Sequence, residues 1–316
     1  MTIIVDHLNC VEGDTDQVIV GGYLEGTSPH GGRGLARLQV HNLYPICGYL
    51  GKEPLYIGIA SNGAFLDVVD SALELWHYRI EPSLVRPVWL PCSFKLSLPS
   101  LPCHVDGCGE HLFVCNTDSP NQLMLWSSGR QQAITVKSEA PIGTVIPMRL
   151  RGGILAPNTL LLPTRVNGNI QLLRLNIEHE WVNTDIIWEG ERVGAIAADE
   201  GAIVLADHRR ILTHHGTSWV TVSYVSERIT ALASYKGCLL VAAQNTINHR
   251  ATLYEVNGAS LTALAFFYGQ QTPIIRSMLV TEEREVYLVG CFTNTEVIGR
   301  VNLKLNFPSF VVFELL

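Results

Sequence analysis

The chain has 316 residues, of which 47% are hydrophobic and only 16% are charged, and its formal net charge is -7. This length allows one large domain or two average ones, and it can bury a core without disulfides or metal ions. An acidic balance with few cations argues against general nucleic-acid binding and against a polybasic membrane contact. The apolar content excludes a disordered chain, because disorder accompanies low hydrophobicity and high charge.

The sequence contains no membrane-spanning or secretory signal. No stretch approaches the ~18 uninterrupted apolar residues of a membrane helix. Residues 1–7 have neither a basic segment nor a long apolar run, so a standard signal peptide is not indicated. We therefore expect no membrane insertion, and a protein that is intracellular (cytoplasmic) or assembled into a particle.

A glycine-punctuated pattern repeats along the chain. Residues 195–207 read A-I-A-A-D-E-G-A-I-V-L-A-D, and residues 231–243 read A-L-A-S-Y-K-G-C-L-L-V-A-A. Each segment predicts two short strands joined by a tight turn, with Gly201 or Gly237 where a positive φ is needed. Looser copies occur at 58–66, at 104–114 and at 278–289. Only in the copy at 278–289 is the glycine replaced.

Two further strands are predicted after each hairpin. In one copy the second hairpin strand at 239–243 is followed by 251–256 and 261–267, and in another the strand at 286–292 is followed by 297–305 and 310–315. Polar and apolar residues alternate strictly at 300–305, which is the period of a strand. Four-stranded units are expected to start near residues 1, 52, 92, 139, 190, 226 and 270.

This organisation resembles the β-propellers as a class, over essentially the whole chain, because propeller blades are four-stranded units of about 45 residues. The resemblance implies an all-β fold and a single β-propeller domain over residues 1–316, with seven blades expected and six as the alternative. No named family is matched, since the Trp-Asp dipeptide of WD repeats is absent. At 64–80 the apolar spacing also fits an amphipathic helix, so strand and helix both stay open there.

Two clusters of possible metal ligands have competing interpretations. Cys103, His104, Cys108, His111 and Cys115 lie within thirteen residues, but their spacing lacks the paired pattern of zinc sites, so buried thiols beside a turn are the favoured interpretation. His208-Arg209-Arg210 and His214-His215 flank one predicted strand, and a polar turn is favoured there over metal or proton chemistry. No metal site and no cofactor are predicted.

The longest polar connections are the best candidates for a binding site. They span 25–34, 116–122, 245–250 and 293–296, and each is predicted to join the second and third strands of a unit, which places them at one end of the propeller. Ordinary solvated turns are the alternative interpretation. The candidate binding residues, including the turn at 208–209, are His30, Arg33, Asp118, Asn121, His208, Arg209, Asn245, His249 and Asn294.

The predicted function is that of a non-enzymatic structural or interaction subunit with protein partners in a larger assembly. Catalytic and nucleotide-binding signatures are absent, and the chain has 17 Arg but 5 Lys, as interfaces favour. A nucleotide-composition bias of the source genome is the other explanation of that ratio. A homo-oligomeric ring and a virion tail or baseplate component are narrower versions of the prediction.

The alternative function is a propeller hydrolase or glycan-binding module that acts through the loops between the second and third blade strands. Such enzymes use carboxylates that converge at the centre of the propeller. Asp199 and Asp207 form one suggestive pair, and Asp106 is a third candidate.

Overall fold

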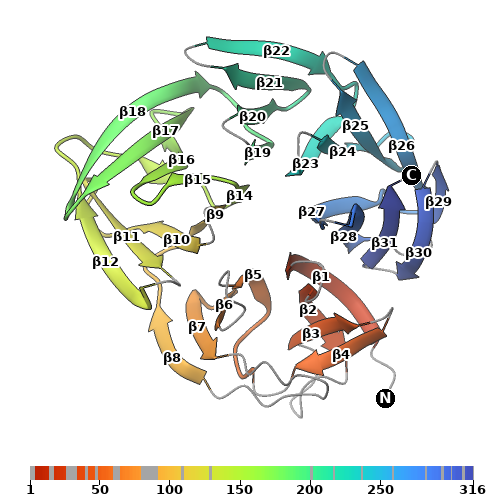
Figure 1. The fold of residues 1–316 in the computed structure, drawn as a ribbon, viewed down its shortest axis with the longest axis horizontal. Coiled ribbons are helices and arrows are strands. Elements are labelled where there is room, and N and C mark those ends of the chain that lie inside the picture. The colour runs from red at the N-terminus through yellow and green to blue at the C-terminus, as the bar shows by residue number, and fades with distance from the viewer. Residues whose placement is uncertain are drawn as a thin grey trace.

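The computed structural model is built from strands arranged around a central axis (Figure 1). It describes residues 4–13, 18–25, 34–39, 42–46, 49–59, 65–79, 92–107, 110–127, 130–199, 202–215, 218–235, 238–257, 260–281, 283–292, 295–299, 301–307 and 310–315. Within these ranges every regular element is a strand, which confirms the predicted all-β fold.

The sheets follow one another around the ring in chain order (Figure 1). The first sheet contains β1 (Ile4–Gly13), β2 (Val18–Glu25), β3 (Gly34–Gln39) and β4 (Asn42–Ile46). The second contains β5 (Pro54–Ile59), β6 (Phe65–Asp70), β7 (Glu74–Arg79) and β8 (Cys92–Ser97). A longer sheet then joins three groups of strands.

The first group in the long sheet is β9 (Cys103–Gly107), β10 (Glu110–Asn116), β11 (Gln122–Ser127) and β12 (Gln132–Lys137). The second is β13 (Thr144–Val145), β14 (Arg149–Arg151), β15 (Ile154–Ala156), β16 (Thr159–Val166), β17 (Asn169–Glu178) and β18 (Trp181–Gly190). The third is β19 (Ala195–Asp199), β20 (Ala202–Asp207), β21 (Arg210–His215) and β22 (Ser218–Tyr224).

Two sheets complete the ring. One contains β23 (Arg228–Tyr235), β24 (Cys238–Asn245), β25 (Arg250–Asn257) and β26 (Ser260–Tyr268), with β29 (Glu296–Gly299) added beside β26. The other contains, in spatial order, β27 (Ile274–Val280), β28 (Glu285–Cys291), β31 (Phe310–Leu315) and β30 (Val301–Phe307).

The pairing resolves several boundaries that the sequence left open. The strand at 92–97 pairs with β7, so it completes the second sheet, and the group expected to start near residue 92 starts with β9 at Cys103. The segment at 64–80 contributes β6 and β7 and not a helix. Leu73, with φ of +62°, lies in the turn between them.

The repeated segments form the predicted hairpins. Residues 195–207 give β19 and β20, and residues 231–243 lie in β23 and β24, whereas Gly201 and Gly237 lie outside the described residues. In the copy that replaces the glycine, Arg284 takes that position with φ of +63°. This turn therefore has the left-handed backbone that the sequence predicts for the repeated position, although an arginine occupies it.

The last sheet departs from chain order. The sequence predicts 297–305 as a third strand and 310–315 as a fourth, but β31 pairs with β28 and leaves β30 outermost, while β29 joins the preceding sheet. Burial explains the exchange, because Val311, Val312 and Phe313 are buried, whereas Ile298 and Leu303 on β29 and β30 are exposed. The more apolar strand takes the inner position.

Burial decreases from the inside of the ring to its circumference. On β16 the consecutive residues Leu160, Leu161 and Leu162 are all buried, because neighbouring sheets cover both faces of this strand. Trp181 and Ile186 on the outer strand β18 are exposed. The long apolar runs of the sequence thus correspond to the second strands of the groups.

A buried polar network joins the second sheet to β10 and β11. The carboxylate of Asp67 lies 2.5 Å from Nδ1 of His77 and 2.7 Å from Nε2 of His111, and it accepts a hydrogen bond of 3.0 Å from the indole of Trp126. Burial by itself would raise the pKa of Asp67, but the hydrogen bonds with His111 and His77 outweigh it and lower the pKa to about 2.

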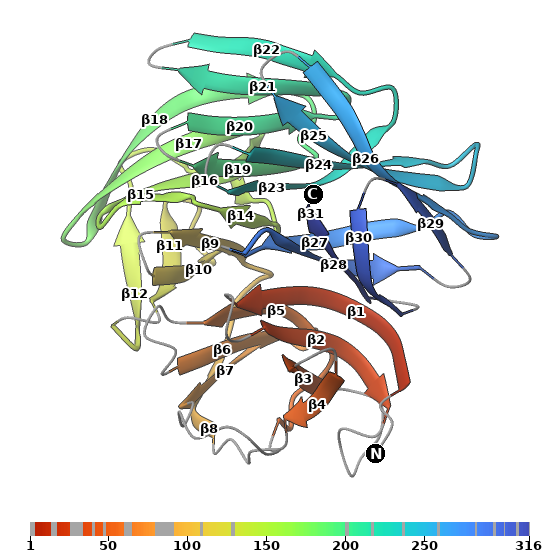
Figure 2. The same ribbon diagram turned by 45° about the vertical axis from the view of Figure 1, so that its right-hand side comes forward.

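The first and last sheets meet along a seam made by side chains. Figure 2 shows β1 beside β27 and β28, which lie far from it in the sequence. Leu8 and Val11 of β1 pack there in one apolar cluster with Tyr287 and Val289 of β28. No strand pairing joins β1 to the last sheet among the described residues, so packing closes the ring at this point.

Candidate functional site: a cationic pocket in the central channel

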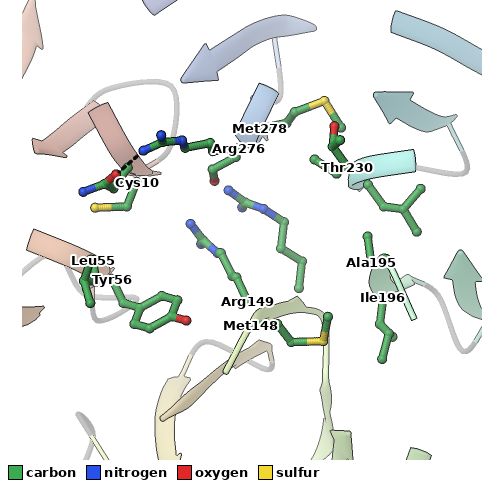
Figure 3. Close-up of a pocket in the computed structure, with 16 residues that line it drawn as sticks. Cys10, Leu55, Tyr56, Met148, Arg149, Ala195, Ile196, Thr230, Arg276 and Met278 are labelled. Atoms are coloured by element: carbon green, nitrogen blue, oxygen red, sulfur yellow. Dashed lines mark hydrogen bonds between the residues drawn. The ribbon is translucent and has the colours of Figure 1, made fainter. Parts of the chain in front are cut away.

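The innermost strands enclose a pocket of about 220 Å³ at the centre of the ring (Figure 3). Its walls come from β1, β5, β14, β19, β23 and β27, together with the residues that precede β14 and β19. The lining includes three arginines, Arg149, Arg151 and Arg276, and no carboxylate. Most of the remaining lining side chains are apolar or uncharged.

The short strand β14 brings two of these arginines into the pocket. It pairs in parallel with β9 on one side and with β19 on the other. Leu150 is buried in the apolar core, so its neighbours Arg149 and Arg151 project to the opposite side of the strand, toward the channel. Gly152 follows with φ of +68°, and a Cβ atom there would lie 1.8 Å from the carbonyl oxygen of Ala198.

The positive charge of Arg149 is balanced by two carboxylates of the protein. It forms ion pairs with Glu12 and, at 3.0 Å, with Asp106, and it donates a hydrogen bond of 2.6 Å to the carbonyl oxygen of Val11. Asp106 also accepts a hydrogen bond of 2.8 Å from the backbone N–H of Gly152. Figure 3 shows Arg149 and Arg276 reaching into the pocket from facing strands.

Arg151 is compensated only in part, by the nearby charge of Asp106. Its Nη2 is buried and has no hydrogen-bond partner, and no ion pair of Arg151 occurs in the described part of the chain. Burial lowers the pKa of Arg151, although the nearby charge of Asp106 opposes the shift. Arg276, on β27, donates a hydrogen bond of 2.6 Å to the side-chain oxygen of Asn9 on β1. The pocket therefore holds more positive than negative charge.

The thiol at the channel wall is chemically inert. Cys10 is buried, its Sγ lies 3.6 Å from the carbonyl oxygen of Gly21, and burial raises the pKa of the thiol to about 12. A thiol in this state is not a thiolate nucleophile near neutral pH. The geometry of the pocket suits binding of an anion, because guanidinium groups pair with carboxylate or phosphate oxygens in a fixed planar arrangement.

The structure places six of the nine predicted binding residues, and they do not line the channel. His30, Arg33 and Asn294 lie outside the described residues. The others lie in the turns β10–β11, β20–β21 and β24–β25, each between the second and third strands of its group; the sequence predicts this position for 116–122 and 245–250 but not for 208–209. Because β9, β14 and β19 run parallel, the β10–β11 and β20–β21 turns emerge at the same end of the ring.

The predicted residues are spread around the ring, and their contacts lie within their own turn or with a neighbouring segment. Asn245 accepts hydrogen bonds from the backbone N–H groups of Ile247 and Asn248, and His249 Nδ1 lies 3.1 Å from the hydroxyl of Thr272. The backbone carbonyl of Asn121 accepts a hydrogen bond from the N–H of Ser138, and Asp118 is exposed. His208 differs, because it lines a second pocket that is considered below.

The possible zinc cluster is not assembled. Cys103, His104, His111 and Cys115 lie on β9 and β10, and Cys108 is outside the described residues. The thiols of Cys103 and Cys115 are buried, as the favoured interpretation predicts, and burial raises the pKa of both. Within the described ranges, no three His, Cys, Asp or Glu side chains gather as metal ligands do.

Sequence reasoning missed the channel arginines. Arg149-Leu150-Arg151 alternates with period two, but three residues are too few to distinguish a strand from a loop. Position within the unit would have indicated these residues, because alternating polar residues in the first strand of a unit face the channel. Arg276 and Thr230, which lie in the first strands β27 and β23, fit the same rule.

Comparisons with known proteins show the fold. A chain in the crystal structure of a mitotic checkpoint complex is similar over 99% of this chain and 89% of its own length, with a TM-score of 0.62 and 10% identity. The β-propeller domain of Cps50 (Swd1) from Myceliophteria thermophila is similar over 83% of this chain and 86% of its own, with a TM-score of 0.54 and 13% identity. The extracellular domain of BT4673 from B. thetaiotaomicron is similar over 96% of this chain and 40% of its own, with a TM-score of 0.60 and 12% identity.

The protein is a β-propeller, as the repeated four-stranded units predict. No family model matches the chain, and no curated protein matches it. Across the described part of the chain, we find no helical segment with the length and apolarity that a bilayer crossing requires.

Proposed function

We propose that this β-propeller is a non-enzymatic interaction subunit of a larger protein assembly, and that its channel pocket receives an acidic side chain of a protein partner. The observation that carries the proposal is Arg151, a channel guanidinium whose Nη2 is buried without a partner. Leaving a buried polar group unsatisfied costs about 1–3 kcal/mol, and more when the group is charged. Arg151 also lines the pocket, so an anionic ligand bound there would offset the charge of its guanidinium.

The arrangement around Arg151 supports binding more than structural stabilisation. Glu12 and Asp106 form ion pairs with Arg149, so Asp106 divides its charge between Arg149 and Arg151. Arg276 contributes a second guanidinium from the far wall, and it is held there by Asn9. A carboxylate between Arg151 and Arg276 would meet two donors that the fold has already positioned.

A hydrolytic function receives less support from the geometry. Asp199 ends β19 and Asp207 ends β20, and these strands are antiparallel, with Ala195 opposite Ala206. The two carboxylates therefore lie at opposite ends of one hairpin and do not converge. Asp106, the third candidate, is bonded to Arg149 and to the backbone of Gly152.

The similar structures favour a general role and not a narrower one. One of them is part of a mitotic checkpoint complex, which is consistent with a propeller that works beside protein partners. Nothing in these structures supports a virion tail or baseplate component or a homo-oligomeric ring, and we do not extend the proposal to them.

The test uses the variant Arg151→Met and a fluorescent hexaglutamate peptide as an acidic probe. We expect Arg151→Met to weaken peptide binding, measured by anisotropy at low salt, by at least about tenfold. The same variant should stabilise the fold by about 1 kcal/mol, because a guanidinium with a buried, unsatisfied N–H group is replaced by an apolar side chain. Arg79→Met, at the exposed end of β7, is the matched control.

The assembly itself is tested with the full chain in its native extract. We expect the tagged protein to sediment with particles much larger than one chain, and Arg151→Met to move it toward the position of the purified monomer. A wild-type chain that sediments as a monomer in the extract would contradict the proposal. So would an Arg151→Met variant that is less stable than wild type and binds the peptide equally well.

A further inference from the structure

A second cationic pocket lies at the rim of the ring, where three groups of strands meet. It has a volume of about 370 Å³ and includes the segment that connects β18 to β19 and the turn between β20 and β21. Its charged residues are Arg165, Arg192, Arg228 and Glu191, with His208 beside them. The uncharged part of the lining is mainly apolar and consists of Ile170, Val193, Ile229 and Gly194.

The three arginines of this pocket are unpaired. In the described residues none of Arg165, Arg192 and Arg228 forms an ion pair or a side-chain hydrogen bond, whereas Arg149, Arg210 and Arg250 all do. Three like charges that share one concavity repel one another, and only Glu191 opposes them. The chain as a whole carries a net charge of -7, so this cluster opposes the overall balance.

The folded backbone, and not a run in the sequence, brings these charges together. Arg165 comes from β16, Arg192 precedes β19, and Arg228 begins β23. Backbone hydrogen bonds fix the walls relative to one another, from the N–H of Gly194 to Ala206 at 2.8 Å and from the N–H of Ile229 to His208 at 3.0 Å. The arginine backbones are therefore held in place before any ligand arrives.

The charge of the pocket identifies the chemistry of its ligand. Three guanidinium groups and one carboxylate leave a net charge of +2 before His208 is counted. A single carboxylate would leave the pocket cationic, whereas a phosphate monoester carries about -1.5 to -2 at pH 7. Guanidinium groups also match the paired oxygens of phosphate. The apolar lining offers contacts to the side chains that flank the phosphate in a peptide.

We propose that this rim pocket binds a phosphorylated serine or threonine in a segment of a protein partner. The proposal rests on the interaction function proposed above, but it concerns a different site. The two pockets adjoin, since Gly194 lines both of them, so one partner is able to occupy the channel and the rim together.

The experiment measures retention of the purified full chain on an immobilised peptide library with phosphoserine at its centre and random flanking residues. The same library with unmodified serine is the reference. We expect retention on the phosphoserine library only, and loss of at least about tenfold in Arg192→Glu and in Arg228→Glu, because each removes a charge-assisted contact and adds repulsion. Arg79→Glu is the matched control, since this exposed arginine lies outside both pockets.

Two further binding measurements separate this proposal from its alternatives. Arg151→Met should keep its binding to the phosphoserine library, so that failure of the channel proposal and failure of this one are separable. Vesicles that contain a phosphoinositide form the second arm. Equal retention on both peptide libraries, or binding to the vesicles without binding to phosphoserine, would overturn the proposal. Thermal melting of each variant verifies that the fold is intact.

Discussion

Replacing Asp67 by asparagine should weaken the contact between the second sheet and β10–β11. Oδ1 of Asp67 lies 2.5 Å from Nδ1 of His77, while Oδ2 lies 2.7 Å from Nε2 of His111 and accepts the indole N–H of Trp126 at 3.0 Å. Asparagine has one acceptor oxygen where aspartate has two. If that oxygen faces Trp126, the amide N–H₂ faces His77, which must then switch tautomer to accept.

The magnitude follows from the charge and the hydrogen bonds. Nε2 of His77 is buried without a partner, so the tautomer switch would place an unsatisfied N–H there. Hydrogen bonds to a charged group contribute about 1.5–3 kcal/mol each, and breaking a buried pair costs about 3–5 kcal/mol. We therefore expect Asp67→Asn to lower the free energy of unfolding by about 3 kcal/mol.

The pH dependence gives an independent measure of the same interaction. The fold lowers the pKa of Asp67 from 3.8 to about 2, so this stabilisation is fully present above the unfolded pKa and is lost as the pH falls through the folded pKa. The shift corresponds to about 2 kcal/mol, lost between about pH 4 and pH 2. In the asparagine variant this part of the acid dependence should be absent.

The assay is urea denaturation of wild type and variant at pH 7 and pH 3, followed by circular dichroism and tryptophan fluorescence. Asp118→Asn is the matched control, because Asp118 is exposed, and we expect it to change stability by less than about 0.5 kcal/mol. A loss below about 1 kcal/mol in Asp67→Asn at pH 7, or an unchanged acid dependence, would refute the reasoning.

Further tests address the backbone and the thiols. Gly152→Ala should lower the free energy of unfolding by about 3 kcal/mol, because its φ is positive and a Cβ atom would lie 1.8 Å from the carbonyl oxygen of Ala198. Gly168→Ala, whose Cβ would meet no atom within 4 Å, should cost only about 1 kcal/mol. Equal melting temperatures of the two variants would contradict this prediction. Iodoacetamide at pH 8 should label exposed Cys92 at least about 100-fold faster than Cys10, because burial raises the pKa of the Cys10 thiol to about 12. Mass spectrometry of the two peptides measures the rates, and comparable rates would show that Cys10 is accessible.

The parts of the fold that the sequence predicted are those with a local cause. Hairpins such as β19–β20 follow from an apolar segment, a tight turn and a second apolar segment, all within thirteen residues. The order of β30 and β31 could not be predicted in this way, because both segments are expected to be strands, and the competition between Leu303 and Phe313 for burial decides which lies inside.

The candidate site was less accessible to sequence reasoning. Arg151 and Arg276 are 125 positions apart in the sequence, and only closure of the ring brings them to one pocket. The predicted loop residues follow a sound rule about polar connections, but Asn245 is engaged in its own turn. His208 lines a cationic pocket because Arg165, Arg192 and Arg228 come from other segments of the chain, which the composition of its own turn does not indicate.

The seam between the first and last sheets makes the resistance of the ring to opening depend on side chains at the channel. Because side-chain packing joins β1 to β28 there, force that separates the two ends of the chain meets apolar contacts and not a ladder of backbone bonds. Arg276 on β27 donates a hydrogen bond across this seam to the side chain of Asn9 on β1. Arg149 on β14 donates one to the carbonyl oxygen of Val11, which also lies on β1. An anion held between Arg151 and Arg276 would add a contact between β14 and β27, and we expect a ring with the anion bound to resist opening more strongly than an empty one.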